Sequence, residues 1–154
     1  MSDLDDLYQD LILDHNKRPR NRRRLEAPDG QAEGYNPLCG DRVTVFLRLE
    51  NGVVKEVTFE GSGCAISTAS ASLMTESVKE KTTEEAKALF YKFHRLATGE
   101  AADGEGGSSL GKLKVFSGVS RYPARVKCAT LAWHTVLAAL DQQTKIVCTE
   151  QQPF

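Results

Sequence analysis

Residues 39–64 read CGDRVTVFLRLENGVVKEVTFEGSGC, and this stretch decides the fold. Apolar and polar residues alternate in it with the period of two that is typical of a β-strand, on both sides of Asn51-Gly52. Asn-Gly favours a tight turn, so the stretch predicts a β-hairpin. A strict two-residue turn would place Leu47 opposite Glu56, and we therefore expect a three-residue turn with Gly52 in the left-handed region.

The hairpin, expected over 42–60, brings candidate metal ligands together. Cys39 and Asp41 precede its first strand and Cys64 follows its second, so they lie at the same end of an antiparallel pair. Cys128 is the fourth candidate. Three thiolates and one carboxylate fill a tetrahedral zinc shell, with Asp41 as the weakest ligand because a carboxylate is the harder donor. Such a centre is anionic, so N–H groups or an arginine are expected beside it.

Most of the remaining chain predicts helices. Apolar residues recur at helical spacing after Ser2 or Asp3, over 65–80, between a Thr82–Glu85 capping box and Gly99, and after Pro123. A helix N-terminus stabilises a thiolate, so Cys64 is expected to have a lowered pKa. The glycine-rich stretch 99–111 predicts an irregular connection, followed by a short helical segment over 113–119.

These elements predict an α+β fold: a small antiparallel β-sheet, made of the hairpin plus a possible third strand, packed against several α-helices. With 154 residues, 40% of them hydrophobic and 27% charged, and a net charge of -1, the composition indicates one soluble globular domain over 1–154. The charge gives no case for nucleic-acid binding. No apolar run predicts a membrane span and the N-terminus is acidic, so we expect a cytoplasmic protein.

Several other features are weaker candidates. The basic run 17–24, broken by Pro19, predicts an extended surface segment, and a solvated tail is favoured over a docking strip for an acidic partner. Arg125 shares a helix side with Cys128, where it can offset the anionic centre or meet a partner. Cys148 is interpreted as a bystander thiol. The histidines lack ligand spacing to the cysteines: His15, His94 and His134.

The three cysteine contexts, Asn-Pro-Leu-Cys-Gly-Asp, Gly-Ser-Gly-Cys-Ala-Ile-Ser and Pro-Ala-Arg-Val-Lys-Cys, resemble the SufU branch of the IscU/NifU-like family. The resemblance includes the 65–74 helix and the 124–133 stretch and runs roughly over 7–140. The scaffold branch, IscU proper, usually has a histidine where this chain has Lys127, and it lacks most of the segment found here between Gly99 and Tyr122. Both departures point towards SufU.

This resemblance implies an IscU/NifU-like fold and a zinc-dependent sulfurtransferase. It would accept persulfide sulfur from a pyridoxal-phosphate cysteine desulfurase of the SufS type and pass it towards a downstream iron-sulfur scaffold. The implied zinc ligands are Cys39, Asp41, Cys64 and Cys128, with Cys39 the sulfur acceptor. The residues themselves agree on Cys39, because its Pro-Leu-Cys-Gly loop can move more easily than a helix.

The alternative is an iron-sulfur cluster assembly scaffold whose cysteines hold a transient cluster. A purely structural zinc site is less favoured, because one ligand is an aspartate and the core is large.

Overall fold

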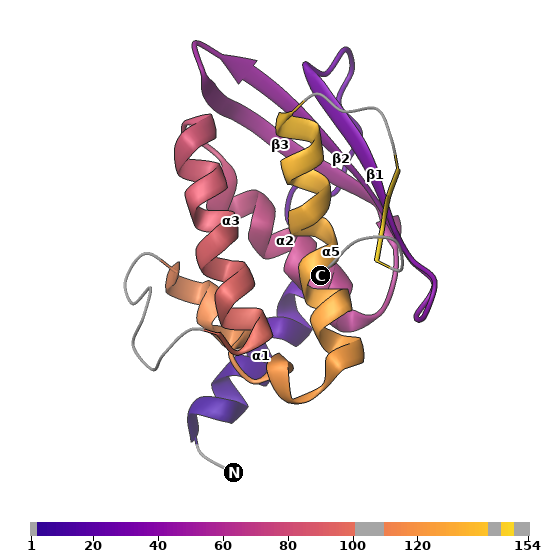
Figure 1. Ribbon diagram of the computed structural model, residues 1–154, viewed down its shortest axis with the longest axis vertical. Helices are drawn as coiled ribbons and strands as arrows, with labels where there is room; N and C mark the ends of the chain where they lie inside the picture. Colours follow the sequence, from indigo (N-terminus) through magenta and orange to yellow (C-terminus); the bar gives the residue numbers. More distant parts are fainter. Residues whose placement is uncertain (1–2, 101–109, 142–145, 150–154) are drawn as a thin grey trace.

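The computed structural model describes residues 3–100, 110–141 and 146–149, with no account of the side chains of residues 3–8 and 146. Its elements are, in chain order, α1 Asp3–Lys17, β1 Gly30–Asn36, β2 Asp41–Glu50, β3 Val53–Ser62, α2 Ala65–Val78, α3 Thr83–Thr98, the 3-10 helices η1 Gly111–Phe116 and η2 Val119–Arg121, α5 Pro123–Leu140 and β4 Ile146–Cys148. The sheet has the order β3-β2-β1-β4. Helices α2, α3 and α5 lie together on one side of it, and α1 packs against α2 (Figure 1). The predicted α+β class is confirmed.

The sheet differs from the prediction at one edge. The third strand exists as β1, which pairs with β2 in antiparallel fashion. A fourth strand, β4, pairs with the other side of β1 and runs parallel to it. The sheet is therefore mixed and not purely antiparallel. Three residues are too few to show a period of two in sequence, which is why β4 escaped prediction.

The hairpin is present, but its turn is shorter than we expected. Glu50 pairs with Val53, so only Asn51 and Gly52 form the turn, with φ values of 53° and 77°. Two successive positive φ values are typical of the type I′ turn that Asn-Gly favours. The three-residue turn is therefore wrong, although Gly52 does adopt the left-handed conformation.

The expected register of the hairpin is nevertheless correct, because a β-bulge supplies the missing residue. The register shifts between Arg48 and Leu49, which leaves Lys55 without a partner across the ladder. Beyond the bulge Leu47 pairs with Val57, so the apolar side chains of both strands face the same way. The hairpin thereby brings its inner face to the helices.

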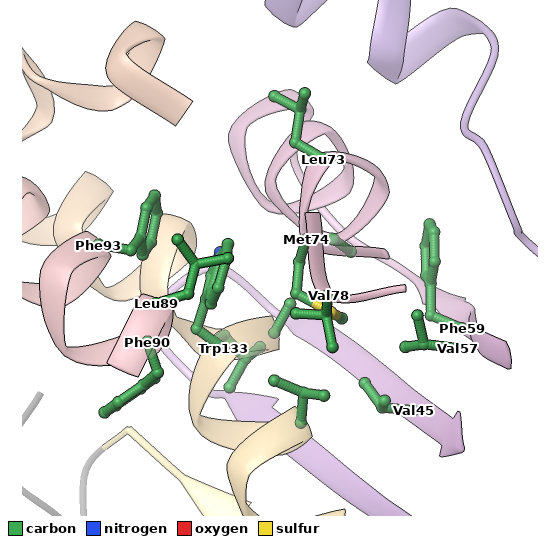
Figure 2. Packing of buried hydrophobic residues seen from close by; sticks show 14 of the residues in the cluster. Val45, Val57, Phe59, Leu73, Met74, Val78, Leu89, Phe90, Phe93 and Trp133 are labelled. Atoms are coloured by element: carbon green, nitrogen blue, oxygen red, sulfur yellow. The ribbon is translucent and has the colours of Figure 1, made fainter. Parts of the chain in front are cut away.

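The core lies between this inner face and the helices (Figure 2). Trp133 of α5 stacks on Phe93 of α3, with ring centroids 4.5 Å apart, and both are fully buried. The predicted stripe of α5 is buried from Ala129 to Leu140, while Val126 is half-buried. Other core residues drawn in Figure 2 come from the sheet and from α2: Val45, Val57, Phe59, Leu73, Met74 and Val78.

Helix ends follow their sequence signals. The predicted capping box of Thr82 and Glu85 begins α3, and Gly99, with a φ of 81°, ends it. Pro123 occupies the first turn of α5. The helical segment expected over 113–119 is present as the 3-10 helices η1 and η2. Most of the glycine-rich connection expected over 99–111 lies outside the described residues.

The basic run is neither extended throughout, as we expected, nor a tail in solvent: Lys17 ends α1, and Arg20 and Asn21 lie in a turn, with Asn21 at a φ of 59°. The backbone carbonyl of Asn21 accepts a hydrogen bond from the N–H of Phe59 in β3, at 3.1 Å. Two arginines of the basic run pair with acidic residues of β3: Arg23 with Glu56 at 3.1 Å and Arg24 with Glu60 at 3.3 Å. The segment therefore runs along the outer edge of β3. No helix in the described part of the chain is long and apolar enough to cross a membrane.

Candidate metal centre

A tight turn between β1 and β2 presents the first cysteine. Cys39 is exposed, and the next residue, Gly40, has a φ of 73° and donates its N–H to the carbonyl of Asn36 at 2.9 Å. A left-handed residue at this point suits glycine best, because it has no Cβ to clash. Leu38, before the cysteine, is 61% exposed. The turn therefore leaves Cys39 at the surface of the molecule.

Three of the four predicted ligands converge at this turn. One ligand atom each of Cys39, Asp41 and Cys128 lies within 4.8 Å of the others. The sulfur atoms of Cys39 and Cys128 are 3.4 Å apart, and both thiols are free. That separation is close to the roughly 3.7 Å edge of a tetrahedron with zinc–sulfur bonds. Asp41 is fully buried and Cys128 is 2% exposed, so the turn cysteine is the accessible member of the group.

Cys64 lies next to this group without being one of the three mutually close ligands. It is the N-cap of α2, and its sulfur accepts a hydrogen bond from the N–H of Ser67 at 3.4 Å. Its own backbone N–H donates to Oδ1 of Asp41 at 2.9 Å. Capping the helix and ligating a metal compete for the same sulfur, because both use its lone pairs. The sequence thus identified four neighbours, of which the structure gathers three and places the fourth beside them.

Cys64 and Cys128 shift each other's pKa in opposite directions. The pKa of Cys64 is lowered to about 6, first because the Cys128 side chain hydrogen-bonds to it and then because of the N–H of Ser67, while burial opposes the shift. The hydrogen bond to Cys64 and burial raise the pKa of Cys128. The lowered pKa that we predicted for Cys64 is confirmed. Its first cause, however, is the neighbouring cysteine and not the start of the helix.

Sequence reasoning missed one residue of the centre, Asn36. It is fully buried at the end of β1, and its amide NH2 donates to Oδ2 of Asp41 at 3.0 Å and approaches the sulfur of Cys128 at 3.6 Å. Together with the N–H of Cys64 it satisfies both oxygens of the buried carboxylate. The signal was present in the Asn-Pro-Leu-Cys-Gly-Asp context, where a buried amide close to the ligands can orient them.

Arg125 lies apart from these hydrogen bonds. It is exposed, and its guanidinium stacks over the ring of Tyr122 at 4.4 Å from the centroid. The N–H donors expected beside an anionic centre are supplied instead by Asn36 and by the backbone of Cys64. Cys148 lies half-buried in β4, paired with Tyr35.

The donor set fits zinc. Thiolates and a carboxylate are donors that zinc accepts, and a fully buried aspartate held by two N–H donors is already oriented for a ligand's role. Cys39, Asp41 and Cys128 would hold the ion, and Cys64 can join them by giving up its bond to Ser67. Four such ligands close the tetrahedral shell.

Residues 7–129 match the family described as NifU-like N terminal domain. This chain belongs to that family. The zinc-dependent sulfurtransferase SufU of Bacillus subtilis is 41% identical over 132 residues, which cover 86% of this chain and 88% of that protein. The iron-sulfur cluster assembly scaffold protein IscU of Thermotoga maritima is 42% identical over 136 residues, covering 88% and 94% of the two chains.

Solved structures of the NifU-like family have the same fold. A putative iron-sulfur cluster assembly scaffold protein for the SUF system from Fervidobacterium islandicum superimposes with a TM-score of 0.78 at 35% identity, covering 84% of this chain and 93% of that one. A nitrogen-fixing NifU-like protein from Brucella abortus gives a TM-score of 0.79 at 29% identity, covering 92% and 96%. The resemblance seen in the cysteine contexts is thereby confirmed. Relatives named SufU and relatives named IscU both match this family member.

Proposed function

We propose that this NifU-like protein is a zinc-dependent sulfurtransferase of iron-sulfur cluster assembly. In this proposal it accepts persulfide sulfur on Cys39 from a pyridoxal-phosphate cysteine desulfurase and passes it to a downstream scaffold. The observation that carries the proposal is the contrast within the three-residue group: Cys39 is exposed on a turn, whereas Asp41 and Cys128 are buried. Cys64, beside the group, is also exposed, but it caps α2. Cys39 is therefore the exposed thiol that a partner protein can reach without disturbing a helix end.

The ligands of the proposed zinc are Cys39, Asp41, Cys64 and Cys128. Bound zinc would keep the cysteine sulfurs deprotonated and protect them from oxidation until a partner arrives. Cys128 is held within α5 and Cys64 at the start of α2. Cys39 lies in the turn between β1 and β2 and not in a helix, so it can shift with less disturbance to the fold. Cys39 is therefore the ligand that can leave the others.

The transfer step balances in atoms and electrons. The thiolate of Cys39 attacks the outer sulfur of the desulfurase persulfide, and a new sulfur–sulfur bond forms as the old one breaks. The desulfurase cysteine leaves as a thiolate, and Cys39 carries the persulfide with its terminal hydrogen. No external oxidant or reductant is needed, because the sulfane sulfur keeps its oxidation state. A second exchange of the same kind hands the sulfur on. A thiolate of the downstream scaffold attacks the outer sulfur of the Cys39 persulfide, and Cys39 leaves as a thiolate.

Docking would take place over the exposed side of the turn. Leu38, beside Cys39, is 61% exposed. Tyr122, which caps the helix that carries Cys128, is 51% exposed, and Arg125 stacks on it. We propose that Arg125 contacts the desulfurase there and does not act on the metal. The reaction needs reduced thiols, which agrees with the cytoplasmic location expected from the sequence.

A Cys39→Ala variant tests the proposal. We expect it to keep the fold and to accept no sulfur from a cysteine desulfurase supplied with cysteine, measured by mass spectrometry of the persulfide and by desulfurase turnover. Cys148→Ala is the matched control, because Cys148 is a free cysteine outside the metal group, and it should behave like wild type. Undiminished transfer to the Cys39→Ala protein would refute the assignment.

The second candidate function is that of a scaffold, which the relatives named IscU favour. Cys39 and Cys128 in the group, and Cys64 beside it, also supply thiolates of the kind that hold iron-sulfur clusters. Metal analysis separates the two functions. Freshly purified protein with one tightly held zinc that accelerates a desulfurase supports transfer, whereas a stable coloured cluster that passes to apo-proteins supports scaffolding.

A further inference from the structure

The C-terminal strand β4 is bonded to the interior of the metal centre. Thr149, directly after the strand, is 3% exposed and donates its backbone N–H to the carbonyl of Tyr35 at 3.1 Å. Its hydroxyl donates to Oδ1 of Asn36 at 3.1 Å. Asn36 in turn donates to Asp41. A chain of two hydrogen bonds therefore runs from the end of β4 to a proposed zinc ligand.

The two sides of the Asn36 amide are distinguished by their partners. Its oxygen accepts the backbone N–H of Leu38 at 3.3 Å as well as the Thr149 hydroxyl, and a backbone N–H can only donate. Its NH2 faces the Asp41 carboxylate, which can only accept when ionised. If the amide were rotated by half a turn, its NH2 would face the N–H of Leu38 and its oxygen would face the Asp41 carboxylate. Neither pair could form a hydrogen bond. The donors on the oxygen side thus fix which side points at Asp41.

We propose that Thr149 is a positioning residue of the metal centre, acting through Asn36 on Asp41. This inference rests on the proposed zinc site. The matched family range ends at residue 129, so the strand adds to the centre a contact from outside that range. Parallel pairing with β1 brings Thr149 beside Asn36, because Tyr35 pairs with Cys148. Hydrogen bonds from outside the ligand shell orient ligands, and their loss typically weakens metal binding by about 10- to 100-fold.

The test replaces the Thr149 hydroxyl in the full-length protein. Thr149→Val keeps the shape of the side chain, and we expect about tenfold weaker zinc binding in chelator competition, with the ligand-field absorption bands of the cobalt-substituted protein displaced. Thr149→Ser keeps the hydroxyl and should restore both readouts. Thr58→Val is the matched control, because the Thr58 hydroxyl is buried without a hydrogen-bond partner in the described part of the chain. Its zinc affinity and cobalt spectrum should equal those of wild type.

The outcomes separate this inference from the proposed function. Wild-type zinc affinity and an unshifted cobalt spectrum in Thr149→Val overturn the role of Thr149 while leaving the zinc site standing. Wild-type protein that holds no zinc overturns both. If Thr149→Val does not fold, Thr149→Ala and Thr149→Ser make the same comparison, because they differ by the hydroxyl alone. Equal zinc affinity in that pair also overturns the inference.

Discussion

Gly63 shows how closely single residues control the metal centre. A Cβ at this position would lie 2.6 Å from Oδ1 of Asp41 and 3.2 Å from the hydroxyl oxygen of Ser67. The first distance is shorter than real Cβ contacts allow, so either the carboxylate or the backbone would have to move. Glycine is therefore needed before Cys64 because of close approach, and not because of an unusual φ. This explains the Gly-Ser-Gly-Cys context at the scale of one atom.

We predict that Gly63→Ala displaces the Asp41 carboxylate and weakens zinc binding by about tenfold or more. Competition with a chromophoric chelator measures the effect. Gly118→Ala is the matched control, because a Cβ there meets nothing within 4 Å, and it should leave zinc affinity unchanged. Equal affinities for the two variants would mean that Asp41 tolerates displacement, or that it is not a ligand.

At the scale of elements, the packing of α3 against α5 contains a pair of histidines. The rings of His94 and His134 lie 5.5 Å apart, and Phe90 packs edge-on against His134 at 5.0 Å. Burial, and then the charge of His94, lower the pKa of His134 to about 4. Neither histidine belongs to the metal group, so this feature concerns the stability of the helix pair.

The lowered pKa of His134 predicts a pH dependence of unfolding. In the unfolded state the pKa of His134 is about 6.5, so the unfolded state binds this proton more tightly than the folded state does. The free energy of unfolding is therefore highest above that pH and falls as the pH drops towards the pKa of the folded state. Between about pH 7 and pH 5 this costs roughly 2 kcal/mol of the free energy of unfolding. His134→Gln should remove that loss, measured by urea unfolding followed through Trp133 fluorescence. The same pH slope in wild type and variant would contradict the assignment.

The elements also show what the sequence can predict. Leu47 pairs with Val57 as expected. Burial of one face of the sheet requires this register, whether a longer turn or a β-bulge produces it. Periodicity could not distinguish a three-residue turn from a two-residue turn with a bulge at Lys55, since both shift the strand by one residue. Asn36 was missed because its role depends on the folded geometry: its amide contacts the Asp41 carboxylate five residues away and the hydroxyl of Thr149, which directly follows a strand that was not predicted.

At the scale of the whole molecule, two segments far apart in the sequence cover opposite edges of the sheet. The arginine-rich segment after α1 lies along β3, and β4 lies along β1 (Figure 1). Sequence reasoning placed neither of them, because a run of charges does not specify its partners and three residues carry no periodic pattern. None of the four proposed ligands belongs to the buried apolar cluster, although Asp41 begins β2, Cys64 caps α2 and Cys128 lies on α5, all of which contribute residues to it.

This separation predicts that removing zinc leaves the fold intact. Phe93 and Trp133 stack on each other and are fully buried, and neither contacts a metal ligand in this stacking. Metal-free, reduced protein should therefore keep its helical circular dichroism signal and unfold cooperatively. Zinc at a hundred times its dissociation constant should add about 2.7 kcal/mol to the free energy of unfolding. Cys128→Ala should lose this increment, while Cys148→Ala keeps it. Loss of the cooperative transition on chelation would show instead that the metal builds the fold, and the centre would then be structural rather than a store for a reactive thiol.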